Sequence, residues 1–181
     1  VACVITEPVL TNSCMVLPAP GFHKALRALT REAGTLLLID ETHTMSSGPG
    51  GYSRAHGLEP DALVLGKPIA GGIPAAVYGF SADCAQRIRA YLGKRAPGHS
   101  GIGTTLAGSK IQLALMRAVL ETYFTREAFA PLIALAKKLE KGIADVIIKH
   151  SVPWHVVRVG ARVEFMCTPE RPRNGGEAAK V

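Results

Sequence analysis

Residues 36–40 read LLLID, and residues 62–67 read ALVLGK. Each stretch is an apolar run that ends in one charged residue, Asp40 in the first and Lys67 in the second. We expect both runs to be buried β-strands of one sheet. In an open α/β sheet, ligands bind outside the carboxyl ends of the strands. The two stretches therefore predict a carboxylate and an amine at the same functional edge.

The segments before Asp40 indicate alternating strands and helices. Residues 1–5 form a short apolar run, and apolar residues recur at helical spacing between Phe22 and Ala33, where Gly34 supplies the stop. This strand-helix-strand order favours parallel pairing with a right-handed crossover. The predicted fold class is therefore α/β, with a mostly parallel sheet flanked by helices.

The chain beyond Asp40 predicts further elements and a change of pattern near residue 150. Residues 42–58 read as a long loop without periodicity. A strand is expected at 75–80, and helices are expected at 81–92, 107–124 and 126–150. Short strands follow at 156–159 and 162–166, with no further helix. We interpret residues 1–150 as part of a large α/β domain and residues 151–181 as the beginning of a small α+β C-terminal domain.

Composition limits the class of protein. With 48% hydrophobic and 19% charged residues, the 181-residue chain is expected to bury a substantial core. No apolar stretch approaches the roughly 18 residues needed to span a bilayer. The basic residues behind the net charge of +7 are interleaved with acidic residues along most of the chain, and only 6% of residues are aromatic. We therefore expect no nucleic-acid partner. Four scattered cysteines and the lack of a secretion leader favour a cytoplasmic location.

Other catalytic chemistries lack their required motifs. The chain contains no GxxxxGK[ST] phosphate loop and no GxSxG nucleophile elbow. No set of histidines and cysteines has metal-ligand spacing, so we predict no metal site. The chain also opens without methionine and closes after a polar, turn-rich stretch, so we expect a piece of a longer protein.

The pairing of Lys67 with Asp40 suggests a particular cofactor. A partly desolvated lysine attacks a carbonyl and forms a Schiff base, and an aspartate can pair with a pyridinium nitrogen. This is the chemistry of pyridoxal 5'-phosphate. Taken singly, a lysine at a strand end is more often a surface residue, and an aspartate there is often a turn residue. Their joint position beside the glycine-rich residues 71–74 favours the cofactor site.

Several motifs resemble one family. LIDE at 38–41, GLEPDAL at 57–63 and LGKPIAGGIP at 65–74 resemble the core of class III, fold type I pyridoxal-phosphate-dependent aminotransferases, close to the branch that contains glutamate-1-semialdehyde aminomutase. Upstream and downstream stretches fit as well: EPV at 7–9, PAPGF at 18–22 and GTTLAG at 103–108, which resembles the family's Gly-Thr-x-x-Gly loop. The resemblance covers most of residues 1–167.

The resemblance implies roles for three residues. Lys67 would form the Schiff base with the cofactor and shuttle a proton between substrate carbon and cofactor carbon. Asp40 would keep the pyridine nitrogen protonated, so that the ring can act as an electron sink. Thr105 would hydrogen-bond the cofactor phosphate from the partner subunit, and Thr104 takes this place if the register differs by one.

Two further positions depart from the usual pattern. Thr42 stands where the family usually has an apolar β-branched residue beneath the ring, and its methyl group can still pack there. His43 is either a contact near the phenolic oxygen of the cofactor or an ordinary loop histidine. Glu7 and Asn12 are further candidates for the site lining, although a structural role before Pro8 is favoured for Glu7.

The function implied by the resemblance is an aminotransferase. It would move an amino group between an amino acid or amine and an oxo acid or aldehyde, with a small-molecule donor and acceptor and a homodimeric assembly. The alternatives are an intramolecular amino transfer of the aminomutase type, and an inactive truncated relative that keeps only the fold. The family's phosphate-cradling loop and ring-stacking aromatic lie upstream of residue 1, so we expect this chain alone to be inactive.

Overall fold

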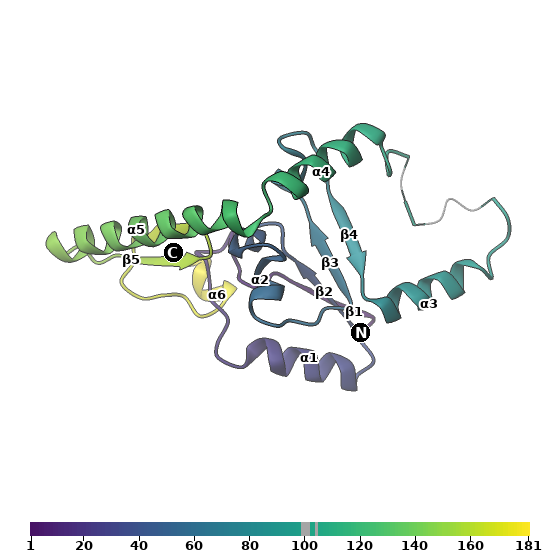
Figure 1. The fold of residues 1–181 in the computed structure, drawn as a ribbon. Helices are drawn as coiled ribbons and strands as arrows, with labels where there is room; N and C mark the ends of the chain where they lie inside the picture. Colours follow the sequence, from purple (N-terminus) through teal and green to yellow (C-terminus); the bar gives the residue numbers. More distant parts are fainter. Residues whose placement is uncertain (99–101, 104) are drawn as a thin grey trace.

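A four-stranded sheet forms the centre of the chain in a computed structural model, which describes residues 1–98, 102–103 and 105–181 (Figure 1). Its strands, in spatial order, are β1 (Cys3–Thr6), β2 (Leu36–Asp40), β3 (Ala62–Leu65) and β4 (Val77–Phe80). β2 pairs in parallel with both β1 and β3, whereas β4 runs antiparallel to β3. The predicted α/β fold with a mostly parallel sheet is confirmed.

The register of β2 against β3 brings their carboxyl ends to one edge. Asp40, the last residue of β2, lies opposite Val64 of β3. β3 ends at Leu65, and Lys67 follows after one glycine. Leu37 and Ile39 are buried in the core. The alternation of buried and half-buried residues along β2 leaves Asp40 half-buried at the strand end.

The helix between the first two strands ends as its glycine predicts. α1 spans Phe22–Glu32, and Gly34 follows with φ 63°. Thr35 N donates to Thr30 O at 2.8 Å, and Gly34 N donates to Arg31 O at 3.1 Å. These two bonds form a Schellman motif, which needs the left-handed backbone that glycine adopts without strain. The chain is thereby turned directly into β2.

The expectation of a structureless loop at residues 42–58 is wrong. The segment contains the 3₁₀ helix η1 (Thr44–Ser47) and the short helix α2 (Gly51–Ala55). Both are too short to show periodicity in the sequence. The expectation of no helix after residue 150 is also wrong, because α6 (Gly175–Ala178) forms with Asn174 as its cap.

Three longer helices follow β4 close to their expected positions. They are α3 (Ala82–Leu92), α4 (Lys110–Thr122) and α5 (Arg126–Lys149). Ser81 Oγ accepts a hydrogen bond from Cys84 N at 3.3 Å, which confirms the predicted N-cap of α3. None of the helices described is both long and apolar enough to span a membrane.

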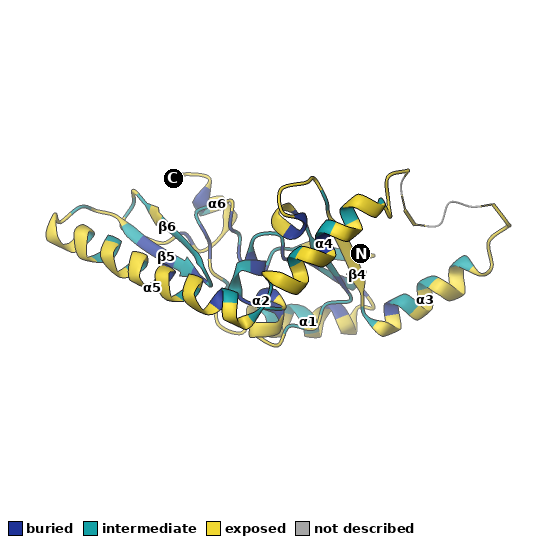
Figure 2. Cartoon of the chain, turned by 45° about the horizontal axis from the view of Figure 1, so that its top comes forward, coloured by how far each residue is buried: buried dark blue, intermediate teal, exposed yellow. Residues whose placement is uncertain are grey.

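A second sheet lies beside α5. It is the antiparallel hairpin of β5 (His155–Val159) and β6 (Arg162–Met166), and α5 contacts both strands (Figure 1). Much of α5 is nevertheless exposed (Figure 2), including Leu132, Leu139 and Val146 of its apolar stripe. The domain boundary at residue 150 stays a prediction.

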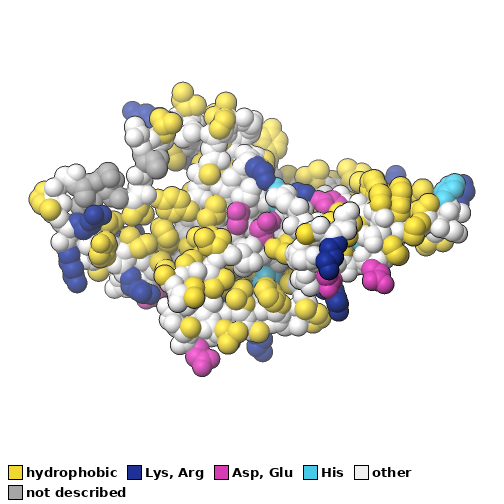
Figure 3. Space-filling model, turned by 180° about the vertical axis from the view of Figure 1, so that it is seen from behind, with side chains coloured by type: hydrophobic (Ala, Val, Ile, Leu, Met, Phe, Trp, Pro, Cys, Tyr) yellow, Lys and Arg dark blue, Asp and Glu magenta, His cyan; other side chains and the backbone are white. Residues whose placement is uncertain are grey.

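Part of the exposed apolar face of α5 lines an apolar groove of about 810 Å³. It lies between α5 and the hairpin, and its lining includes Leu139, Ile143, Trp154 and Phe165. Hydrophobic side chains gather over this end of the molecule in the space-filling view (Figure 3). The long apolar stripe of α5 is therefore only partly buried by the residues described.

Two buried clusters connect the sheets to the segments that carry the polar residues. One joins Val9 and Met15, which precede α1, to Val157 and Val159 of β5. The other contains Met45, Ile69, Ala70 and Met116, and thus packs the turns after β2 and β3 beneath α4. The segments that follow β1, β2 and β3 are therefore each anchored by buried side chains.

Asp61 connects α1, β2 and β3 through one carboxylate. Its Oδ2 accepts hydrogen bonds from Arg27 Nη1 at 2.7 Å and from Leu37 N at 2.8 Å. Partial burial by itself raises the pKa of Asp61, but the bonds from Arg27 and Leu37 outweigh it, so the pKa lies below its usual value. A carboxyl group with a lowered folded-state pKa stabilises the fold once it is ionised.

We expect Asp61→Asn to destabilise the complete protein by about 1 kcal/mol at pH 6, because the neutral amide accepts these bonds more weakly. The contribution of Asp61 is fully present above its unfolded-state pKa of about 3.9 and is lost as pH falls through its lower folded-state pKa. The difference between the urea unfolding midpoints of the two proteins should therefore shrink below about pH 4. A difference that stays constant down to pH 3 would contradict this account.

Candidate functional site

Asp40 is oriented by the backbone that follows it. Its Oδ1 accepts a hydrogen bond from Thr42 N at 2.9 Å. The next residue, Glu41, donates its backbone N–H to Val64 O at 2.9 Å and so continues the pairing of β2 with β3. The carboxylate of Asp40 is therefore held at the sheet edge, with Oδ1 tied to the turn.

Glu41 is a buried carboxylate that organises the turn after Asp40. It is only 1% exposed and accepts hydrogen bonds from Thr44 Oγ1, Tyr52 N and Ser53 N. These partners lie in η1 and α2, so one side chain holds both short helices. A buried carboxylate is tolerated only when it is satisfied in this way. The sequence named Glu41 only as part of the LIDE motif at 38–41 and did not predict that it holds η1 and α2 together.

Lys67 begins a tight turn with an unusual backbone. Its φ is 54°, a left-handed conformation that is uncommon for a residue with a side chain. It opens the 3₁₀ helix η2 (Lys67–Ala70), whose Ile69 and Ala70 are 0% and 1% exposed. These buried residues hold the strained turn in place, while the Lys67 side chain stays exposed. Strain of this kind clusters at functional sites.

An open hollow of about 600 Å³ lies beside Lys67. Gly72, Ile73, Pro74 and Gln112 also line it. Gln112 Nε2 donates to Pro74 O at 2.8 Å, which ties the glycine-rich turn to α4. Lys67 therefore lines accessible space next to the glycine-rich backbone.

His43 connects Lys67 to the segment after β1. Its Nε2 is hydrogen-bonded to Lys67 Nζ, and its Nδ1 lies 2.5 Å from Thr11 Oγ1. Burial lowers the pKa of His43, and the positive charges of Lys67 and Arg162 lower it further. The negative charges of Glu7 and Asp40 oppose this effect. The histidine is therefore kept in its neutral form over a wider pH range than a free imidazole.

The contacts of Glu7 and Thr11 were not foreseen. Thr11 is 2% exposed, and its Oγ1 lies 2.6 Å from Glu7 Oε2. Glu7 thus reaches His43 through Thr11, in addition to shaping the turn at Pro8. The available sequence signal was the four-residue spacing of these two polar residues in the segment that joins β1 to α1.

The remaining expected site residues differ in their placement. Thr42 packs beside Gly66, where an added Cβ would lie 3.5 Å from Thr42 Oγ1. Asn12 is exposed. Thr105 is exposed in the segment between α3 and α4, and Thr104 lies outside the described residues. The structure therefore brings Lys67 and His43 into contact near Asp40. The phosphate contact expected of Thr105 stays a prediction.

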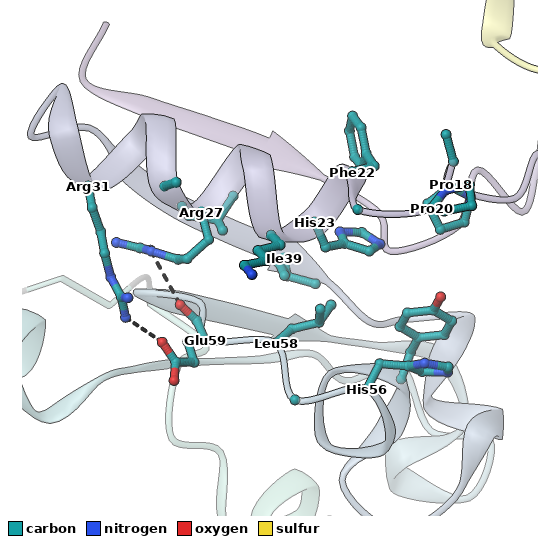
Figure 4. Close-up of a pocket in the computed structure, with 17 residues that line it drawn as sticks. Pro18, Pro20, Phe22, His23, Arg27, Arg31, Ile39, His56, Leu58 and Glu59 are labelled. Atoms are coloured by element: carbon teal, nitrogen blue, oxygen red, sulfur yellow. Dashed lines mark hydrogen bonds and ion pairs between the residues drawn. The ribbon is translucent and has the colours of Figure 1, made fainter.

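A separate cavity of about 650 Å³ lies between α1 and the segment that precedes β3 (Figure 4). Phe22 and the prolines lie at one end of it, whereas Arg27 and Arg31 reach toward Glu59 at the other. None of the expected site residues lines this cavity. It is a space under α1, whose lining includes Ile39 but neither Asp40 nor Lys67.

Comparison with known proteins decides the family. The family model described as aminotransferase class-III matches residues 1–177. The chain belongs to the class-III aminotransferase family. This match confirms the resemblance drawn from the motifs around Asp40 and Lys67, and it covers both sheets of the structure.

The similar proteins are named either as aminomutases or as aminotransferases. A variant glutamate-1-semialdehyde-aminomutase from Pseudomonas aeruginosa PAO1, solved in complex with PMP, is 52% identical with a TM-score of 0.92, over 98% of this chain and 40% of that chain. A β-phenylalanine aminotransferase from Variovorax paradoxus is 27% identical with a TM-score of 0.85, over 99% of this chain and 40% of that one.

A curated relative agrees with these structures. A glutamate-1-semialdehyde 2,1-aminomutase from Thermomicrobium roseum is 38% identical over 163 residues, which is 89% of this chain and 36% of the relative. This class-III aminotransferase chain thus spans well under half the length of the relatives that it matches.

We expect Gly51→Ala to destabilise the complete protein more than Gly57→Ala. Both glycines have positive φ, 66° and 65°, so both substitutions cost about 1–2 kcal/mol of backbone strain. At Gly51 the new Cβ would also lie 2.7 Å from Glu41 Oε2, whereas nothing lies within 4 Å at Gly57. Because Glu41 is buried and hydrogen-bonded, we expect about 1–3 kcal/mol more for Gly51→Ala.

Urea unfolding of both variants measures this difference. Equal shifts of the two unfolding midpoints would show that Glu41 moves aside without cost, and would contradict its role as a rigid support for η1 and α2.

Proposed function

We propose that the complete protein containing this chain is a pyridoxal-phosphate-dependent aminotransferase. It moves an amino group between an amino acid or amine and an oxo acid or aldehyde. The observation that carries this proposal is the placement of Asp40 and Lys67 at the carboxyl ends of two paired strands, β2 and β3. The chain that carries them belongs to the class-III aminotransferase family. The proposal extends to the whole protein because the chain spans 40% of a relative solved with PMP.

The residues present fit pyridoxal 5'-phosphate. The amine of Lys67 is exposed beside an open hollow, so a carbonyl compound can reach it. Asp40 offers a carboxylate whose Oδ1 is fixed by Thr42 N, which leaves its second oxygen for a pyridinium N–H. When bound, the cofactor supplies an electron sink for charge that develops on the substrate carbon.

The chain's own residues then divide the work. Lys67 Nζ would hold the cofactor covalently, and as a free amine it would serve as the group that moves the substrate's proton. The carboxylate of Asp40 holds the proton on the ring nitrogen by charge attraction. The methyl group of Thr42 would contact the cofactor ring, and His43, which is hydrogen-bonded to Lys67, would contact the same ligand.

The protein acts as a homodimer in this proposal. Thr105 is exposed in the segment between α3 and α4, which suits a phosphate contact made across a subunit interface. Thr104 takes the same task if the loop register differs by one. A reducing, cytoplasmic location is supported by the cysteines, since none of the four forms a disulfide in the described structure.

A second candidate function is intramolecular amino transfer of the aminomutase type. It is favoured by the 52% identity to a glutamate-1-semialdehyde-aminomutase. The two functions use the same amine and carboxylate, so fold and site do not separate them. They differ in one measurable requirement, because only the intermolecular reaction consumes an external amino acceptor.

We expect the complete protein with pyridoxal 5'-phosphate to show a visible or near-ultraviolet absorbance band and to transfer an amino group only when an external oxo acceptor is supplied. Lys67→Ala should abolish turnover and the absorbance band of the lysine-bound cofactor, because Lys67 supplies the attaching amine in this proposal. The measurements are the absorbance spectrum and the rate of product formation with and without acceptor.

Lys137→Ala serves as the matched control, because Lys137 is an exposed lysine on α5. It should retain both the band and turnover. Turnover that needs no acceptor would favour the aminomutase alternative. A folded protein that never forms the band would overturn the proposal and support a relative that keeps only the fold.

Mixed dimers test the cross-subunit task of Thr105. We expect Lys67→Ala chains and Thr105→Ala chains each to have low activity alone. When the two are co-expressed, each mixed dimer has one site with an intact Lys67 and an intact Thr105 from its partner. Activity of the mixed dimers should therefore rise to about half that of the wild type. No recovery on mixing would show that Thr105 acts within its own chain.

A further inference from the structure

We propose that Glu7 and Thr11 set the tautomer of His43, so that His43 Nε2 carries a lone pair and accepts a hydrogen bond from the Lys67 amine. Four side chains form one continuous row in the order Glu7, Thr11, His43 and Lys67. This inference rests on the proposed function, because the row serves catalysis only if Lys67 is the reacting amine.

The direction of the row follows from counting hydrogens. Thr11 Oγ1 lies 2.6 Å from Glu7 Oε2 and 2.5 Å from His43 Nδ1. A hydroxyl has one hydrogen, and a carboxylate only accepts. Thr11 therefore donates its hydrogen to Glu7 and accepts one from the Nδ1–H of His43. Glu7 Oε2 also accepts from Thr11 N at 3.3 Å, which fixes the hydroxyl relative to the carboxylate.

The far side of His43 is then determined. A neutral imidazole carries one N–H, so an Nδ1–H leaves Nε2 as a bare acceptor. Lys67 Nζ, which only donates when protonated, is the group hydrogen-bonded to that atom. The opposite tautomer would place an N–H donor against the ammonium and leave the buried Thr11 hydroxyl without a donor from His43.

The charges around the row favour the neutral imidazole. Glu7 and Thr11 reach His43 from the segment after β1, Asp40 from the end of β2, Lys67 from η2 and Arg162 from β6. Arg162 Nη2 donates to Thr11 O at 3.4 Å, so this guanidinium lies close to the row. Burial and the two positive charges together lower the pKa of His43, in agreement with a single proton on the ring.

The consequence for Lys67 is control of its amine. Lysine has a flexible stem and an exposed head, so a fixed acceptor holds Nζ at one point above the turn. His43 thus sets the place of the amine, while Thr11 and Glu7 act as positioning residues through the histidine.

The first test reads the tautomer without any cofactor. The complete protein is prepared in its cofactor-free form with ¹⁵N-labelled histidine, and the His43 signals are assigned by their loss in His43→Gln. We expect the ring-nitrogen chemical shifts to show Nδ1–H in the wild type and in Thr11→Ser, which keeps the hydroxyl. In Thr11→Val the buried Nδ1–H would lack an acceptor, so the proton should move to Nε2.

The second test measures how readily the Lys67 amine reacts with the cofactor. The rate at which the cofactor-free protein takes up pyridoxal 5'-phosphate is followed by absorbance at one fixed pH. In Thr11→Val an N–H donor faces Lys67, so the amine loses the acceptor that holds it in place, and uptake should slow by about 2- to 10-fold. Thr11→Ser should keep the wild-type rate, and Thr30→Val, which alters another buried threonine, should do the same.

These readouts separate this inference from the proposed function. If the protein never takes up the cofactor but His43 carries Nδ1–H, the function fails and the tautomer assignment survives. An Nε2–H signal in the wild type would overturn the inference, and that measurement needs no variant to fold. A Thr11→Val protein that folds with an unchanged tautomer and an unchanged uptake rate would overturn it as well.

Discussion

The parallel pairing of β2 with β3 is the constraint on which the site depends. Because Asp40 lies opposite Val64, the end of one strand and the turn after the other come to the same sheet edge. A register slip of one residue would turn Asp40 to the other face of the sheet. The apolar side chains that bury Leu37 and Ile39 therefore also fix where the carboxylate lies.

Polar groups near this edge are satisfied by one another. Glu41 is buried but accepts hydrogen bonds from η1 and α2, and Thr11 is buried but bonded to both Glu7 and His43. Each such group would be costly if left without a partner. Lys67 adds backbone strain, which the burial of Ile69 and Ala70 offsets. The edge is therefore organised by contacts within the chain itself, and preorganised groups lose little freedom on binding.

The longer elements were predictable because their signals are local. The helix at Phe22–Glu32 and the cap at Ser81 follow from periodicity and side-chain chemistry within a few residues. The short helices after β2 were missed because Glu41 organises them through contacts with residues up to 12 positions away. The row from Glu7 to Lys67 was missed for a related reason, since its members come from segments that are distant in sequence.

The sequence by itself determined the α/β class, the family and the two charged strand ends, because apolar runs, glycine stops and contiguous motifs are properties of short segments. Only the tertiary structure decided that His43 bonds to Lys67 and that Glu7 reaches it through Thr11. These relations depend on the angles at which separate segments pack, and hydrophobic burial at Val9, Met15, Val157 and Val159 sets those angles. No pattern of neighbouring residues encodes them.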